Sequence, residues 1–158
     1  MQTIHWKITN QQSNQVIYQE AAELLQNGEC VAFPTETVYG LGADATNQAA
    51  IQKIYEAKGR PSDNPLIVHI ARRNQMDSFA ASYPPKAIQL MDKFWPGPLT
   101  IILPLKKDSL ATNVSAGLST VGVRMPEHPV SLALISAANV PVAAPSANRS
   151  RKTKPNNS

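Results

Sequence analysis

The sequence predicts a single α/β domain in which a mixed, twisted β-sheet is flanked by helices. Strand-like and helix-like segments alternate along the whole chain, which is the pattern of such domains. The length of 158 residues suits one domain with a buried core. The composition, 42% apolar and 16% charged, is typical of a folded globule rather than a disordered chain.

In the first half of the chain, apolar periodicity predicts two strands and two helices. A short strand is expected at residues 4–8, and Asn14 can cap an amphipathic helix that ends at Gly28. A buried strand follows at 31–33, then a glycine-containing loop, then a helix from Asn47. The residues expected to face the core from the two helices are Ile17, Ala21, Leu24, Leu25, Ile51, Ile54 and Tyr55.

The second half continues the alternation, and its segment 99–105 is a strongly apolar predicted strand. Most of the 13 prolines lie between predicted elements, where they favour rigid loops. Strands are predicted at 66–70, 99–105, 121–124 and 140–144, and helices near 75–81, 85–94 and 130–138.

The basic character of the chain is concentrated in its last eight residues. The net charge is +4, but Arg151, Lys152 and Lys154 supply three of those charges, and residues 1–150 hold 12 basic against 11 acidic side chains. A near-neutral body disfavours a broad nucleic-acid surface. Binding of RNA therefore remains an alternative that rests mainly on the tail.

Cysteine content and hydropathy limit the class of protein further. Cys30 is the only cysteine, so the chain has no internal disulfide and no cysteine metal cluster. In the apolar run 30–33 it is expected to be a small core residue rather than a nucleophile. No apolar run is long enough to span a bilayer, and residues 1–10 lack the pattern of a signal peptide. We therefore expect a cytoplasmic protein that does not contact membranes.

A first candidate site lies in Pro-Thr-Glu-Thr-Val-Tyr-Gly-Leu-Gly at 34–42, where polar groups follow a buried strand. Ligands of α/β folds bind at such strand ends. An ordinary turn would explain the glycines but not the hydroxyl groups. Gly40-x-Gly42-x-x-Ala45, with Asp63, also matches the letters of a dinucleotide fingerprint. We interpret this match as coincidence, because six residues separate the strand from Gly40.

A second candidate site combines cations from one loop with polar residues at the ends of three strands. Lys58 and Arg60 form a plausible phosphate clamp, although Lys58 would also complement a helix dipole. His69 lies in an apolar strand, where a histidine is more often a core residue than a ligand. Arg124 ends another apolar strand and needs an anionic partner, for which a ligand carboxylate would serve. After the last strand, Ser146 could bond phosphate or cap a turn.

Five motifs follow one another in a fixed order: 34–42, Lys-Gly-Arg-Pro-x-x-Asn-Pro-Leu at 58–66, Phe-Trp-Pro-Gly-Pro-Leu-Thr at 94–100, Val-Arg-x-Pro at 123–126 and Ser-Ala-Asn at 146–148. Together they resemble the YrdC-like family of threonylcarbamoyl-AMP synthases, from about residue 28 to 150. The resemblance implies the twisted fold of that family. It also implies an enzyme that joins L-threonine, bicarbonate and ATP into threonylcarbamoyl-AMP and releases pyrophosphate, for the modification of tRNA adenosine 37 with downstream tRNA-modification proteins.

The resemblance also assigns roles to single residues. It implies no covalent nucleophile, because positioning and charge neutralisation suffice when a carbamate attacks a phosphate. Mg²⁺ is expected to bridge the phosphates with few protein ligands, so no metal-binding residue is assigned. The implied threonine-binding residues are Thr35, His69, Arg124 and Ala144, and the implied ATP-binding residues are Lys58, Arg60, Asn64, Thr120 and Ser146.

The end of the chain departs from the family pattern. Where the family continues Gly-Lys-Pro-Ser-Pro-Thr, residues 151–158 read Arg-Lys-Thr-Lys-Pro-Asn-Asn-Ser. We expect a YrdC-like domain at 1–150 and a basic, non-family tail at 151–158. One codon choice for the tail, read one base later, encodes the family continuation, so our hypothesis is a frameshift that cuts the domain short and weakens the ATP side. The gene sequence would test this.

Two other functions remain open at this point. One is a non-catalytic RNA-binding module, which a near-neutral body and few clustered aromatic residues disfavour. The other is a carbamoyl-transfer domain of the hydrogenase-maturation type, which is related in fold. Against it, the chain has no zinc-finger or acylphosphatase-like segment.

Overall fold

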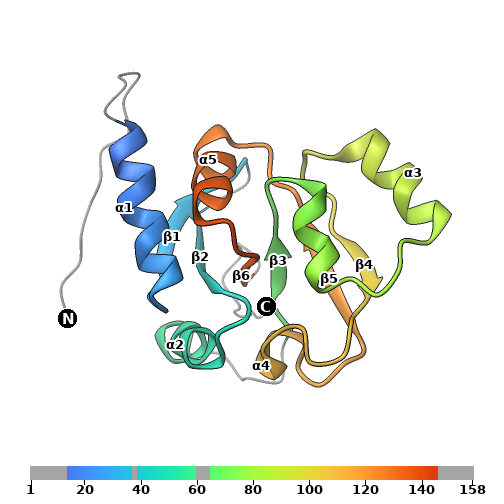
Figure 1. The fold of residues 1–158 in the computed structure, drawn as a ribbon, viewed down its shortest axis with the longest axis horizontal. Coiled ribbons are helices and arrows are strands. Elements are labelled where there is room, and N and C mark those ends of the chain that lie inside the picture. The colour runs from blue at the N-terminus through green and yellow to red at the C-terminus, as the bar shows by residue number, and fades with distance from the viewer. Residues whose placement is uncertain (1–13, 37–38, 60–64, 146–158) are drawn as a thin grey trace, which may run out of the picture.

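Helices and strands alternate along the chain as the sequence predicts (Figure 1). The structure is a computed structural model, and it describes residues 14–36, 39–59 and 65–145. The predicted strand at 4–8 and the tail at 151–158 lie outside these residues. The elements are α1 (Asn14–Gln26), β1 (Val31–Pro34), β2 (Tyr39–Asp44), α2 (Gln48–Lys58), β3 (Ile67–His69), the 3₁₀ helix η1 (Arg73–Ser78), α3 (Pro85–Phe94), β4 (Ile101–Pro104), α4 (Thr112–Ser115), β5 (Thr120–Arg124), α5 (Pro129–Ala138) and β6 (Val142–Ala144).

The six strands form one mixed sheet in the order β1-β2-β6-β3-β5-β4. Among the strands that the structure describes, only β3 and β5 run parallel, and the other neighbours are antiparallel. In the parallel pair, His69 is in register with Arg124, and across the antiparallel pair His69 faces Val142. The last residues of β3 and β5 therefore meet at one edge of the sheet, beside the first residue of β6.

The segment Tyr39–Asp44 is a strand, whereas the sequence predicted a loop there. It returns beside β1, and Phe33 is in register with Gly40. The two glycines obscured this strand, but Gly42 is there because of packing: a Cβ at that position would come within 2.6 Å of Phe33 and of Val142. Both glycines lie inside a strand rather than at a strand-to-helix turn, so the dinucleotide fingerprint is excluded.

The predicted helix boundaries are largely confirmed. Asn47 is the N-cap of α2, and its Oδ1 accepts a hydrogen bond from the Ala50 N–H at 3.0 Å. Gly59 ends α2 at φ 63°, a left-handed conformation that glycine adopts readily. The helix predicted at 75–81 is instead the shorter η1, which begins two residues earlier, and the single turn α4 was not predicted.

The sheet separates two hydrophobic clusters. One lies between the sheet and α2, η1, α3 and α4 and includes Val68, Leu103 and Val123. The other lies beneath α1 and α5, which stand next to each other in Figure 1, and it involves β1 and β6. On this second face the part of the sheet at β4 and β5 stays open, since Ile102 is 62% exposed.

Successive side chains of β5 point to opposite faces of the sheet, so Arg124 lies on the open face and Val123 on the covered face. Among the described residues, no helix is both long enough and apolar enough to cross a membrane.

Candidate functional site

Arg124 is the centre of the candidate site, and its backbone surroundings hold it firmly. It is the last residue of β5 and is buried. Its Nε donates a hydrogen bond to the carbonyl of Gly97 at 3.1 Å, while the Gly97 N–H donates to the carbonyl of Met125 at 2.8 Å. The same loop is braced by Trp95, whose indole N–H donates to the carbonyl of Leu99 at 2.8 Å. The motif at 94–100 thus fixes the guanidinium from one side.

The other side of Arg124 faces the carboxylate of Glu36. Nη2 of Arg124 lies 2.7 Å from Oε1 of Glu36, which also accepts a hydrogen bond from the Glu127 N–H at 3.2 Å. Nη2 is buried, yet within the described residues it makes no hydrogen bond of acceptable geometry, so the contact is one of charge. A buried arginine donor without a hydrogen bond is costly unless a better acceptor arrives. A ligand carboxylate that replaced Glu36 would supply such an acceptor.

Glu36 is ionised at neutral pH. Burial by itself raises the pKa of Glu36, but its own backbone N–H, the guanidinium of Arg124 at hydrogen-bonding distance, the Glu127 N–H and the charge of Arg124 together outweigh it and lower the pKa below its usual range. The Glu36 side chain is 21% exposed, against 9% for Arg124. The carboxylate is therefore the more accessible member of the pair and the one with room to move.

His69 lies beside Arg124 in register and is a buried, neutral histidine. Its Nδ1 is 3.1 Å from the carbonyl of Ile67, and its ring meets Phe33 edge to face at 5.8 Å between centroids. Burial, and next the charge of Arg124, lower the pKa of His69 to about 4. The imidazole consequently adds no positive charge to the site at neutral pH.

Two further residues assigned to threonine are located by their neighbours in the chain and in the sheet. Thr35 is buried and directly precedes Glu36, and the carbonyl of Pro34 accepts a hydrogen bond from Ser131 of α5, which ties this loop to the helix. Ala144 pairs with Ile67, two residues along β3 from His69. All four residues assigned to threonine are thus described, and Arg124 and His69 are direct neighbours in the sheet.

The residues assigned to ATP are described only in part. Lys58 is exposed at the C-terminal end of α2, where its charge also complements the helix dipole, and Thr120 is exposed at the start of β5. Thr120 shares the open face with Arg124, about 13 Å away for four strand residues. Arg60, Asn64 and Ser146 lie outside the described residues, so their placement stays a prediction.

The open face between Thr120 and Arg124 is apolar and closely packed. Gly122 lies midway, and a Cβ there would come within 3.0 Å of Thr100 and 3.4 Å of Ile102. With glycine at this position, no side chain projects from this face between the two ends of β5.

Sequence reasoning missed the partners of Arg124 rather than Arg124 itself. The sequence predicted that Arg124 needs an anionic partner and that a ligand would provide it, whereas in the structure the partner is the carboxylate of Glu36. The signal was present, because Glu36 is a carboxylate in the first motif. The hydrogen bonds from Arg124 to Gly97 and from Glu127 to Glu36 use backbone atoms, which every residue type has, so the sequence does not reveal them.

Cys30 is partly buried against the first cluster, and its Sγ–H points to the carbonyl of Ala50 at 3.8 Å. Burial raises the pKa of Cys30, as expected of an unreactive thiol. Across residues 14–36, 39–59 and 65–145, no three metal-binding side chains of His, Cys, Asp or Glu gather into a cluster.

Comparison with known proteins shows the family to which this chain is similar. The Sua5/YciO/YrdC family model, described as "Telomere recombination", matches residues 23–158. The threonylcarbamoyl-AMP synthase of Bacillus subtilis is 61% identical over 136 residues, which are 86% of this chain and 39% of that protein. The synthase of Halorhodospira halophila is 39% identical over 132 residues, which are 84% of this chain and 68% of that protein.

A crystal structure of Pyrococcus abyssi Sua5 complexed with L-threonine superimposes with a TM-score of 0.83 at 49% identity, covering 89% of this chain and 41% of the other. The chain spans about two fifths of the length of the Bacillus relative. The predicted fold is confirmed by this superposition. Since the family model covers most of the sequence and five of its motifs occur in order, the chain belongs to the Sua5/YciO/YrdC family.

Proposed function

We propose that this chain binds L-threonine through Arg124 and takes part in forming threonylcarbamoyl-AMP from threonine, bicarbonate and ATP. The observation that carries the proposal is the buried guanidinium of Arg124, whose Nη2 lacks a hydrogen bond and faces a carboxylate. Relatives named threonylcarbamoyl-AMP synthase and a Sua5 structure with L-threonine support it.

In this proposal the threonine carboxylate replaces that of Glu36 on Arg124. The like charges of the two carboxylates then drive Glu36 outward, which its partial exposure permits. The neutral ring of His69 forms one side of the threonine pocket and, being uncharged, does not repel the amine of threonine. Thr35, beside Glu36, and the backbone of Ala144 complete the pocket.

The chemistry that follows needs position and charge neutralisation rather than a protein nucleophile. The threonine nitrogen bonds to the carbon of bicarbonate with loss of water, giving a carbamate. A carbamate oxygen then bonds to the α-phosphorus of ATP while the bond to pyrophosphate breaks. Lys58 and Thr120, with Arg60, Asn64 and Ser146 as predicted partners, would hold the phosphates at the far end of the open face.

Mg²⁺ would arrive with ATP. The described residues assigned to ATP offer an amine, on Lys58, and a hydroxyl, on Thr120, which suit phosphate oxygens rather than a metal ion. The ion would supply neutralisation of phosphate charge. Three statements remain predictions: the product is used for tRNA adenosine 37, tRNA-modification proteins act as partners, and the location is cytoplasmic. An RNA-binding role that depends on the tail also remains a prediction.

The test separates threonine binding from turnover. Pyrophosphate release by the 158-residue chain is measured with ATP, bicarbonate and L-threonine, and threonine binding is measured by calorimetry. Arg124→Ala should abolish both. Arg73→Ala, which removes an exposed arginine paired with Asp92 at 2.7 Å, is the matched control and should change neither. Threonine binding that survives Arg124→Ala would refute the proposed site, and binding without release would restrict this chain to the threonine half of the reaction.

A further inference from the structure

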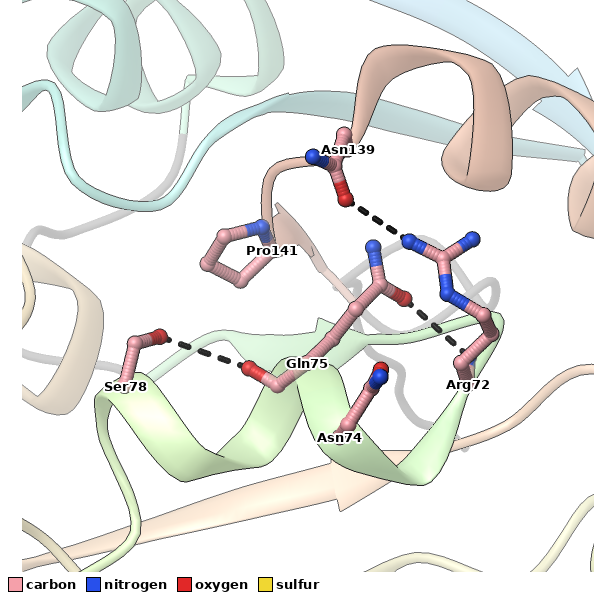
Figure 2. Close-up of a pocket in the computed structure, with 6 residues that line it drawn as sticks. All are labelled: Arg72, Asn74, Gln75, Ser78, Asn139 and Pro141. Carbon is pink, nitrogen blue, oxygen red and sulfur yellow. Dashed lines mark hydrogen bonds between the residues drawn. The ribbon is translucent and has the colours of Figure 1, made fainter.

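A cavity separate from the Arg124 site lies beyond the end of β3 and before the start of β6. Its volume is about 260 Å³, and Figure 2 shows the side chains around it. None of the six lining residues is acidic. They are Arg72, Asn74, Gln75, Ser78, Asn139 and Pro141.

Gln75 presents a buried hydrogen-bond donor that has no acceptor. Gln75 is only 8% exposed, and its side-chain Oε1 accepts hydrogen bonds from the N–H groups of Ala71 at 2.6 Å and Arg72 at 3.1 Å. Those two donors fix which end of the amide is oxygen. The remaining atom, Nε2, is buried and has no partner among the described residues. Figure 2 shows it turned into the space between Pro141 and Arg72.

Arg72 brings a positive charge that no carboxylate neutralises within the described residues. Its Nη1 donates to the hydroxyl of Ser136 at 2.6 Å and its Nη2 to Oδ1 of Asn139 at 2.7 Å, and both acceptors are neutral. The nearby carboxylates are engaged elsewhere. Asp77 accepts a hydrogen bond from Tyr83 at 2.6 Å, and Asp92 pairs with Arg73.

We propose that this cavity binds a small oxyanion, a phosphate or a carboxylate. The guanidinium of Arg72, already oriented by two neutral acceptors, supplies the charge, and Nε2 of Gln75 supplies a buried donor. A water molecule would satisfy the amide but would not form an ion pair with the exposed guanidinium of Arg72, as an anion would. The bound anion would join the segment after β3 to the turn before β6, whose Val142 pairs with His69. The proposal does not depend on the threonine reaction.

The test uses inorganic phosphate and acetate as probes, titrated separately into the ¹⁵N-labelled 158-residue chain at constant ionic strength. We expect saturable shifts of the Gln75 side-chain amide and of the Arg72 Nε–H. Arg72→Gln should weaken binding at least about tenfold, because it removes charge-assisted hydrogen bonds. Arg73→Gln makes the same change of net charge next to the cavity and should alter binding less than about twofold.

Gln75→Glu gives a second, nearly isosteric test. It keeps the oxygen that accepts from Ala71 and Arg72 but replaces the buried donor by a negative charge, so it should abolish binding while the fold, checked by the same spectra, is retained. Binding of phosphate alone or of acetate alone identifies the class of ligand. Shifts spread over all surface arginines, or equal losses in Arg72→Gln and Arg73→Gln, would overturn the proposal, as would an unmoved Gln75 amide.

Discussion

Nη2 of Arg124 lies 2.7 Å from Oε1 of Glu36, so a carboxylate from the protein itself occupies the position where a ligand carboxylate is expected. The pair neutralises a charge that would otherwise be buried alone. It leaves Nη2 without a hydrogen bond among the described residues, and so it is an incomplete partner. Competition between Glu36 and the ligand for Arg124 follows from this geometry.

Glu36→Gln tests that competition. The amide fills nearly the same volume but carries no charge, so threonine no longer has to displace an ion pair. We expect threonine to bind several-fold more tightly, by about 1 kcal/mol, while the free energy of unfolding falls by about 1–3 kcal/mol. Calorimetry and urea denaturation measure the two effects. Weaker threonine binding would show instead that Glu36 positions Arg124 for the ligand.

Arg124→Met should destabilise the fold by about 3 kcal/mol, because it leaves the carboxylate of Glu36 in the site without its cation. Adding Glu36→Gln should recover part of that loss, since the unpaired charge is then removed as well. A double-mutant cycle in urea gives the coupling free energy, which we expect to be about 1–3 kcal/mol. A coupling near zero would mean that the contact contributes nothing in solution.

His69 makes stability fall in acid. Its pKa is about 4 in the folded chain and 6.5 in the unfolded chain, so between these values the unfolded chain binds the extra proton. The contribution of His69 to the free energy of unfolding is fully present above pH 6.5. It is lost as the pH falls towards 4, and the total loss is about 3 kcal/mol. Glu36, whose pKa is lowered by folding, acts in the same direction at lower pH.

Urea denaturation between pH 7 and pH 4 measures this dependence. His69→Gln, which cannot titrate, should flatten the profile in that window. The control is His128→Gln, at a half-buried histidine that accepts a hydrogen bond from the Val130 N–H at 3.1 Å. An unchanged slope in His69→Gln would mean that another group causes the acid sensitivity.

Gly42→Ala should destabilise the fold by about 1–3 kcal/mol, because the new methyl group would come within 2.6 Å of Phe33 and Val142 in a packed interior. Gly40→Ala is the matched control in the same strand, where the nearest atoms are at an ordinary 3.5 Å, and it should change stability by less than about 1 kcal/mol. Thermal denaturation compares the two. Equal effects would contradict the packing explanation for the glycine in β2.

The fold class and most elements could be predicted from local patterns. The helices of α1, α2, α3 and α5 have apolar residues at helical spacing, and Asn47 and Gly59 mark the ends of α2 by their own chemistry. The strand β2 could not be predicted in this way. Gly42 is required by the ring of Phe33 and by Val142, which is 100 residues away, so the cause is not local.

For the candidate site, local sequence patterns were enough to predict that Arg124 needs an anion, that His69 sits in an apolar strand and that polar groups follow the strands. Three relationships came from the folded chain instead: Arg124 faces Glu36, His69 is its neighbour in register, and Gly97 holds the guanidinium through a backbone carbonyl. A residue type fixes which partners a side chain requires, because charge and hydrogen-bonding capacity are local. The pairing of strands distant in sequence decides which partner it meets.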